Sequence, residues 1–161
     1  MKKIKRALIS VSDKKYLKNI LTILKKFKVE IISTGGTFKE IKKLKFKCIK
    51  LSNYTNFPEI LGGRVKTLHP KIYGGILNIR KNKKHLKDLK KNNLKDIDLI
   101  IVNFYPFEKI VQKTNDHKKI IENIDIGGPT MVRAAAKNYN DVTILTSPHQ
   151  YLSFVNQLNQ N

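Results

Sequence analysis

The stretch Asp98-Leu99-Ile100-Ile101-Val102-Asn103 is apolar at its four central positions and polar at both ends. A short run of this kind, rich in β-branched residues, is typical of a strand that is buried on both faces of a parallel sheet. Residues 7–11, 29–32 and 141–145 have a similar apolar pattern, and residues 46–51 alternate in the manner of a strand. We therefore predict a mainly parallel sheet of about five strands.

Segments with a helical spacing of apolar residues separate these strands. The strand at 7–11 is followed by a predicted helix at 16–27, the strand at 29–32 and a second helix over 37–44. Strands that alternate with helices form parallel sheets with right-handed crossovers. The sequence therefore predicts a three-layer α/β fold, with helices covering both faces of the sheet.

The other helices are predicted from weaker patterns. Ser12 or Asp13 is suited to cap the helix at 16–27, and Pro129 is suited to the first position of a later helix. Residues 52–79 show no sustained period, so we expect a long loop that is functional or contains short helices, with 57–61 as a candidate. Further helices are expected at residues 82–92, which are very polar and should face solvent, and at 117–123, 130–137 and 151–158.

Composition restricts the class of protein. The chain has 161 residues, which suits a single domain over residues 1–161. Its single cysteine, Cys48, fits a reducing compartment, so we expect a cytoplasmic protein, and no apolar run approaches the ~20 residues of a membrane span. The net charge of +21 comes mainly from scattered lysines, without a recognition helix or stacking pair. We therefore do not expect a specific role in nucleic-acid binding. We do expect weak binding to polyanions, because the net charge is strongly positive.

Polar residues gather where the predicted strands end. Ligands of open α/β sheets bind at the carboxyl ends of the strands. Ser10 and Ser12, residues 33–37 and residues 103–105 all fall at those ends. We therefore expect these segments to form one site.

The segment Ser33-Thr34-Gly35-Gly36-Thr37 follows a predicted strand and opens a predicted helix. Main-chain N–H groups at a helix start, together with glycines and hydroxyls, suit a phosphate group. Lys14 could add a cation to the same phosphate. The segment lacks both the P-loop ending and the dinucleotide fingerprint, and a purely structural glycine turn explains it equally well.

A second glycine segment, Leu61-Gly62-Gly63-Arg64-Val65-Lys66-Thr67-Leu68-His69-Pro70, fits neither a helical nor a strand period. Arg64 and Lys66 would lie on the same side of an extended segment and could grip an anion. The alternative is a surface turn with solvated charges. We favour a functional loop, because long loops often carry binding residues.

Asp125 and Lys137 flank the glycine pair Gly127-Gly128, and Arg133 shares a helix face with Lys137. Helix capping would explain Asp125 and Lys137 equally well, and Tyr105 could be a core aromatic residue. The four histidines and the lone cysteine have no metal-ligand spacing, and a serine nucleophile elbow is absent. These residues favour a phosphorylated small molecule and proton transfer, without a metal or another cofactor.

Six blocks together resemble the IMP cyclohydrolase domain of the bifunctional purine-biosynthesis enzyme. They are residues 10–14, 34–37, 62–70, 103–107, 124–128 and 133–138, in the order of that family, and the likeness runs from about Ala7 to Tyr151. The resemblance implies the methylglyoxal-synthase-like fold, which is Rossmann-like. It also implies a cyclic amidine hydrolase that closes the ring of 5-formamidoimidazole-4-carboxamide ribotide to give IMP. The family's formyltransferase domain would follow residue 161 and is absent from this chain.

The resemblance also assigns roles to residues. It implies that the 5′-phosphate is held by Ser12, Lys14, Thr34, Gly35, Gly36 and Thr37. Ser10, at the end of the first predicted strand, is a further substrate-binding candidate. It implies that the ring-closing region is lined by Arg64, Lys66, Thr67, Asn103, Tyr105, Asp125 and Gly127. Lys137 is the leading acid/base candidate, with Asp125, Tyr105 and Lys66 as the other catalytic candidates. The family likeness further implies a homodimer, a nucleotide as the small-molecule partner, and no cofactor.

Three other functions remain open from the sequence. A methylglyoxal synthase of the same fold would need a carboxylate beside the phosphate loop, for which Asp13 is the nearest candidate. A regulatory nucleotide-binding module would not require Tyr105, Asp125 and Lys137 together. A basic RNA-associated protein would owe its binding to charge alone.

Overall fold

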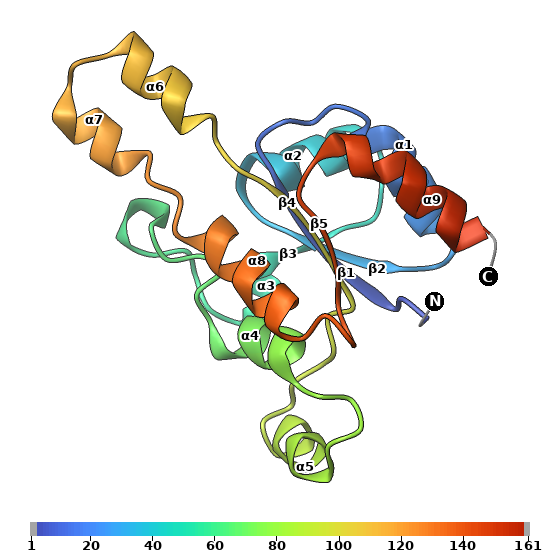
Figure 1. Ribbon diagram of the computed structural model, residues 1–161. Helices are drawn as coiled ribbons and strands as arrows, with labels where there is room; N and C mark the ends of the chain where they lie inside the picture. The colour runs from blue at the N-terminus through green and yellow to red at the C-terminus, as the bar shows by residue number, and fades with distance from the viewer. Residues whose placement is uncertain (1–2, 160–161) are drawn as a thin grey trace.

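The computed structural model describes residues 3–159 and contains one five-stranded parallel sheet (Figure 1). The strands are β1 (Arg6–Val11), β2 (Glu30–Ser33), β3 (Ile49–Lys50), β4 (Leu99–Asn103) and β5 (Thr143–Leu145). Their order across the sheet is β3-β2-β1-β4-β5, and every pairing is parallel. The predicted parallel sheet is therefore confirmed.

Helices cover both faces of this sheet, as predicted for a three-layer α/β fold. Buried residues alternate along β1, so that Ala7 and Ile9 face one layer while Leu8 faces the other. The first layer contains α1 (Leu17–Lys26), α2 (Gly35–Lys43) and α9 (Tyr151–Asn159). The second contains α3 (Leu51–Thr55), α4 (Pro70–Leu77) and α8 (Gly127–Lys137).

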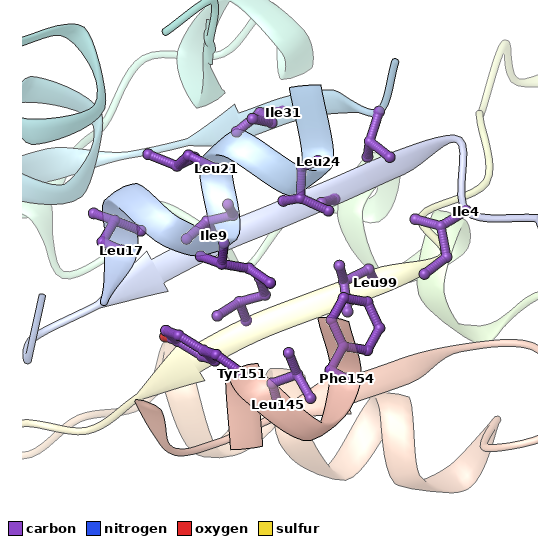
Figure 2. Packing of buried hydrophobic residues seen from close by; sticks show 14 of the residues in the cluster. Ile4, Ile9, Leu17, Leu21, Leu24, Ile31, Leu99, Leu145, Tyr151 and Phe154 are labelled. Atoms are coloured by element: carbon purple, nitrogen blue, oxygen red, sulfur yellow. The ribbon is translucent and has the colours of Figure 1, made fainter. Parts of the chain in front are cut away.

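The first layer shows how distant segments share one core. Figure 2 shows Ile9 of β1 and Leu99 of β4 between the α1 residues Leu17, Leu21 and Leu24 and the α9 residues Tyr151 and Phe154. Burial of such side chains contributes about 1.5–3 kcal/mol each relative to full exposure. The first helix, α1, and the last helix, α9, therefore pack on the same face of the sheet.

The segment 52–79, which has no sustained period in the sequence, contains short helices, as one of the two predicted alternatives allowed. It contains most of α3, a short 3-10 helix η1 (Leu61–Gly63) and α4, whereas the candidate segment 57–61 is not a regular helix. The α4 side chains Ile72 and Ile76 are fully buried. Two glycines and a proline in eight residues weaken the helical pattern, so tertiary packing decides this helix.

Three predicted element boundaries are wrong. β3 pairs only over Ile49–Lys50, so it is shorter than the strand predicted at residues 46–51. Helix α1 begins after Tyr16, which has a left-handed backbone with φ of 57°, so neither Ser12 nor Asp13 caps it. Helix α8 begins at Gly127, which makes Pro129 its third residue and not its first.

Two parts of the molecule extend away from the sheet. Helix α5 (Lys83–Lys91) has no buried residue, which confirms the predicted solvent-facing helix. Helices α6 (Phe107–Lys113) and α7 (His117–Glu122) form a projecting arm that also contains no buried residue (Figure 1). We predicted α7 but not α6. A short 3-10 helix, η2 (Pro148–Gln150), precedes α9. No helix within residues 3–159 is both long enough and apolar enough to span a membrane.

Candidate active site

A cavity of about 610 Å³ opens at the carboxyl edge of the sheet. It brings together every candidate residue from the sequence except Lys137. These lining residues are Ser10, Ser12, Lys14, Thr34, Gly35, Gly36, Thr37, Arg64, Lys66, Thr67, Asn103, Tyr105, Asp125 and Gly127. We call the part around residues 10–14 and 34–37 the phosphate end, and the part around residues 62–67, 105 and 121–128 the loop end.

Sheet register explains why the phosphate end forms. Val11 at the end of β1 is paired with Asn103 at the end of β4, and Ile9 is paired with Ser33 at the end of β2. Three strands therefore end at nearly the same level. The loops that follow them must leave the sheet side by side.

The start of α2 is the anion-binding feature of the phosphate end. Thr34 precedes the helix in an extended conformation, and no side chain caps the helix. Gly35 has φ of +55°, a left-handed conformation that favours glycine. Main-chain N–H groups at the start of this nine-residue helix therefore face the cavity without a side-chain acceptor, which suits an anion.

The threonine hydroxyls at this end are engaged in internal hydrogen bonds. The buried Thr37 hydroxyl donates to the Val11 carbonyl at 2.9 Å and accepts from the Val11 amide at 3.0 Å. The Thr34 hydroxyl donates to Glu59 Oε1 at 2.6 Å. These side chains fix the turn, so the helix N–H groups and Lys14 are the groups best suited to meet an anion.

Asn103 shapes the turn after β1. Its Oδ1 accepts from the amides of Ser12 at 2.7 Å and Asp13 at 2.9 Å, and its Nδ2 donates to the Asp13 carbonyl at 2.9 Å. The resemblance implied that Asn103 lines the ring-closing region. In the structure, the side-chain amide of Asn103 forms its hydrogen bonds with the main chain of Ser12 and Asp13, at the phosphate end.

The loop end is built on two glycines with positive φ. Gly62 has φ of 62° and Gly63 has φ of 90°, and a Cβ on Gly63 would lie 2.6 Å from Lys66 Cε. Arg64 adopts a helical conformation, so the prediction of an extended segment is wrong. Arg64 and Lys66 nevertheless line the same cavity.

A carboxylate lies beside each of these two cations. Arg64 contacts Glu122 of α7 through two nitrogens, at 2.8 and 3.1 Å, and both side chains are largely exposed. Lys66 Nζ lies 3.9 Å from Glu59 Oε2. We did not single out Glu59 or Glu122 from the sequence, because an isolated glutamate without a fixed spacing gives no signal.

Asp125 and Thr67 define the floor of the loop end. Asp125 Oδ1 accepts from the Gly128 amide at 2.9 Å, which leaves its carboxylate at the start of α8. Thr67 is buried, and a Cβ on Gly127 would lie 2.5 Å from its hydroxyl oxygen. Glycine at position 127 therefore permits the close contact between α8 and the loop.

Tyr73 and His69 lie behind this loop. Burial raises the pKa of the Tyr73 phenol, and the hydroxyls of Thr130 and Thr67 oppose that rise. Burial, assisted by the charge of Lys71, lowers the pKa of His69. His69 Nδ1 accepts from the Lys71 amide at 3.1 Å and so caps α4.

Lys137 is not brought to the cavity. It is the exposed last residue of α8, whereas Gly127 at the first position of that helix lines the cavity. An α-helix rises 1.5 Å per residue, so about 15 Å of helix axis separates the two positions. Asp125 lies two residues before α8 and Lys137 ends it, so the structure does not bring the two residues together, and the acid/base role that the resemblance implies for Lys137 stays a prediction.

Most of the remaining side chains at the loop end are exposed. Tyr105 is 60% exposed at the mouth of the cavity, between β4 and the arm. Ile121, Asn123, Ile124 and Ile126 also line this end. Within residues 3–159, histidine, cysteine and carboxylate side chains form no group of three that could hold a metal ion.

Comparison with known proteins identifies relatives of this chain. The family model described as "MGS-like domain" matches residues 17–130. Proteins named "Bifunctional purine biosynthesis protein PurH" are 52% identical over 156 residues in Acetivibrio thermocellus and 51% identical over 162 residues in Leptospira biflexa. These matches cover 96% and 100% of this chain, but only 30% and 32% of the relatives.

A solved structure supports the same relationship. The structure titled "Crystal structure of ForH" superposes with a TM-score of 0.85 at 30% sequence identity. The alignment covers 97% of this chain and 79% of the other. The parallel sheet, the matched residues 17–130 and these relatives lead to one conclusion: the chain belongs to the family of MGS-like domains.

Proposed function

We propose that this chain is an IMP cyclohydrolase, which closes 5-formamidoimidazole-4-carboxamide ribotide to IMP with loss of water. One observation carries the proposal. Lys66, Tyr105 and Asp125 line the same cavity as the uncapped start of α2. The identity of about 50% to the first third of proteins named for purine biosynthesis supports the same assignment.

The phosphate end would anchor the ribotide. The helix N–H groups of α2 and the Lys14 ammonium would receive the 5′-phosphate, since a helix start favours negative charge. Thr37 and Asn103 would act by holding these groups in place. The substrate's imidazole would then extend toward the loop end.

The loop end would bring two weakly reactive groups together. The carboxamide nitrogen must attack the formyl carbon, and holding both in contact can supply on the order of 7–11 kcal/mol. Negative charge develops on the formyl oxygen during the attack. The Lys66 ammonium or the Tyr105 hydroxyl would donate to that oxygen, which stabilises the transition state.

Loss of water completes the reaction. The formyl oxygen leaves as water after it gains two protons, while the carboxamide nitrogen and the formamide nitrogen each lose one. Asp125 is suited to accept a proton, since it lines the cavity and the Gly128 amide fixes its carboxylate through Oδ1. Lys66 is suited to return one to the departing oxygen.

The role implied for Lys137 needs a separate test. Lys66 lines the cavity and Lys137 does not. We therefore expect Lys66→Met to lower kcat more than Lys137→Met does. A greater loss from Lys137→Met would show that the chain rearranges, or that a second copy supplies this lysine.

The direct test mixes the purified chain with the formamido ribotide and follows the ultraviolet band of the purine product. Asp125→Ala should lower kcat by about 10²–10⁴-fold, as expected for loss of a proton-transfer group. IMP binding measured by isothermal titration should remain largely unchanged. Cyclisation by Asp125→Ala at the wild-type rate would disprove the assigned role, and a wild-type chain that does not cyclise would disprove the function.

The geometry favours none of the alternative functions. Asp13, the carboxylate that a methylglyoxal synthase would need, is exposed, accepts from the Lys15 amide and does not line the cavity. An assay of phosphate release from dihydroxyacetone phosphate tests that activity. A homodimer and a cytoplasmic location remain predictions.

A further inference from the structure

Glu59 contacts both ends of the cavity. Its Oε1 accepts from the Thr34 hydroxyl at 2.6 Å, directly before α2, and its Oε2 lies 3.9 Å from Lys66 Nζ. The side chain is 28% exposed. Since the two oxygens contact different segments, this one carboxylate links the phosphate end to the loop end.

The charges of the two ends are balanced differently. At the loop end, Glu59 lies beside Lys66, Glu122 lies beside Arg64, and Asp125 also lines the cavity. At the phosphate end, Lys14 and the start of α2 line the cavity, and the Glu59 carboxylate beside them accepts from the Thr34 hydroxyl. An incoming phosphate therefore meets Lys14 and the N–H groups of α2 at one end, whereas Arg64 and Lys66 at the other end already lie beside carboxylates.

We propose that Glu59 is a positioning and specificity-determining residue, which orients Lys66 and directs the phosphate of a nucleotide to the α2 end. The inference rests on the proposed function for the identity of that nucleotide. Without Glu59, Lys66 would offer a second, competing cation to the phosphate. A nucleotide could then bind with its phosphate at the wrong end, which would prevent ring closure.

Glu59 is better placed for this role than Glu122. The Arg64–Glu122 pair is exposed by 61% and 59%, and exposed ion pairs are screened by water and salt. The Lys66–Glu59 pair is exposed by 36% and 28%, and the Thr34 hydrogen bond fixes its carboxylate. Removing the negative charge of Glu59 should therefore change phosphate binding more than removing the negative charge of Glu122.

The test compares Glu59→Gln with Glu108→Gln, using inorganic phosphate and IMP as probes in isothermal titration. Glutamine at position 59 keeps an oxygen for the Thr34 hydroxyl but loses the charge beside Lys66. Glu108 lies on α6 outside the cavity lining, so its variant controls for the change in net charge. We expect Glu59→Gln to shift the phosphate-to-IMP affinity ratio about three- to fivefold toward phosphate, with no such shift in the control.

Repeating the Glu59→Gln substitution in a Lys66→Met chain tests whether Glu59 acts through Lys66 or changes phosphate binding independently of it. If Glu59 acts through Lys66, Glu59→Gln should cause no further shift in a Lys66→Met chain. An unchanged affinity ratio in the single variant, or an equal shift in the Lys66→Met background, would overturn the inference. Phosphate titration does not require turnover, so a chain that fails to cyclise would disprove the proposed function while this test still applies.

Discussion

The two ends of the cavity are built in different ways. At the phosphate end, Thr37 and Asn103 are held by several hydrogen bonds to the ends of β1 and the turn after it. At the loop end, Arg64 and Glu122 contact each other while both remain about 60% exposed. The phosphate end is therefore fixed by hydrogen bonds at the ends of strands, whereas the loop end depends on exposed loops that can change conformation.

The largest expected effect on stability comes from the phosphate end. Thr37→Val removes a buried hydroxyl and leaves both the amide and the carbonyl of Val11 without their partner. We expect a loss of about 2–3 kcal/mol in the free energy of unfolding, measured by denaturant titration. IMP affinity should fall as well, because the start of α2 loses its attachment to β1.

Thr22→Val is the matched control for that experiment. Thr22 also donates a hydroxyl to a carbonyl, that of Lys18, but it is exposed on α1. Its variant should change stability by no more than about 0.5 kcal/mol. A Thr37→Val chain as stable as the control would mean that the phosphate end is not rigidly built.

An intermediate effect is expected at His69, which follows the loop and caps α4. Only the neutral imidazole can accept from the Lys71 amide, and burial lowers the pKa of His69 from 6.5. This stabilisation is therefore complete above pH 6.5 and is lost as the pH falls below it. We expect denaturant titration to show about 0.5–1 kcal/mol less stability at pH 5 than at pH 7.5 from this cap.

His69→Asn isolates this contribution, because asparagine can cap a helix but does not titrate. The difference between the wild type and His69→Asn should grow as the pH falls from 7.5 to 5. Parallel pH curves for the two chains would contradict the assignment of the cap.

The smallest effect on stability is expected at Arg64. Arg64→Gln removes an exposed ion pair, so the midpoint of denaturant unfolding should not change measurably. IMP affinity should nevertheless fall about tenfold, because the variant removes a cation from the cavity. A large loss of stability would show that the two ends are built alike.

The sheet was predictable because its strands are short, apolar and separated by periodic helices. The rule that ligands bind at strand ends then brought Ser10, Ser12 and Lys14 together with residues 34–37. Helix α4 was missed because its glycines hide the helical period, and only the packing of Ile72 and Ile76 reveals it.

The loop end was less predictable from physical reasoning. Spacing along the chain does not reveal that Glu59 lies beside Lys66, or that Glu122 of α7 reaches Arg64. The resemblance gave Lys137 an acid/base role, but the sequence blocks do not show that the length of α8 separates this residue from the cavity lining.

The order of the strands also has a consequence for how the chain folds. β1 is synthesised first, yet it occupies the centre of the sheet and needs partners on both sides. The Arg6 amide beside its start donates to Asp98, which lies 92 residues further along the chain. Pairing of strands so far apart along the chain is slow, and the open edge of β1 must stay protected from aggregation until β4 leaves the ribosome.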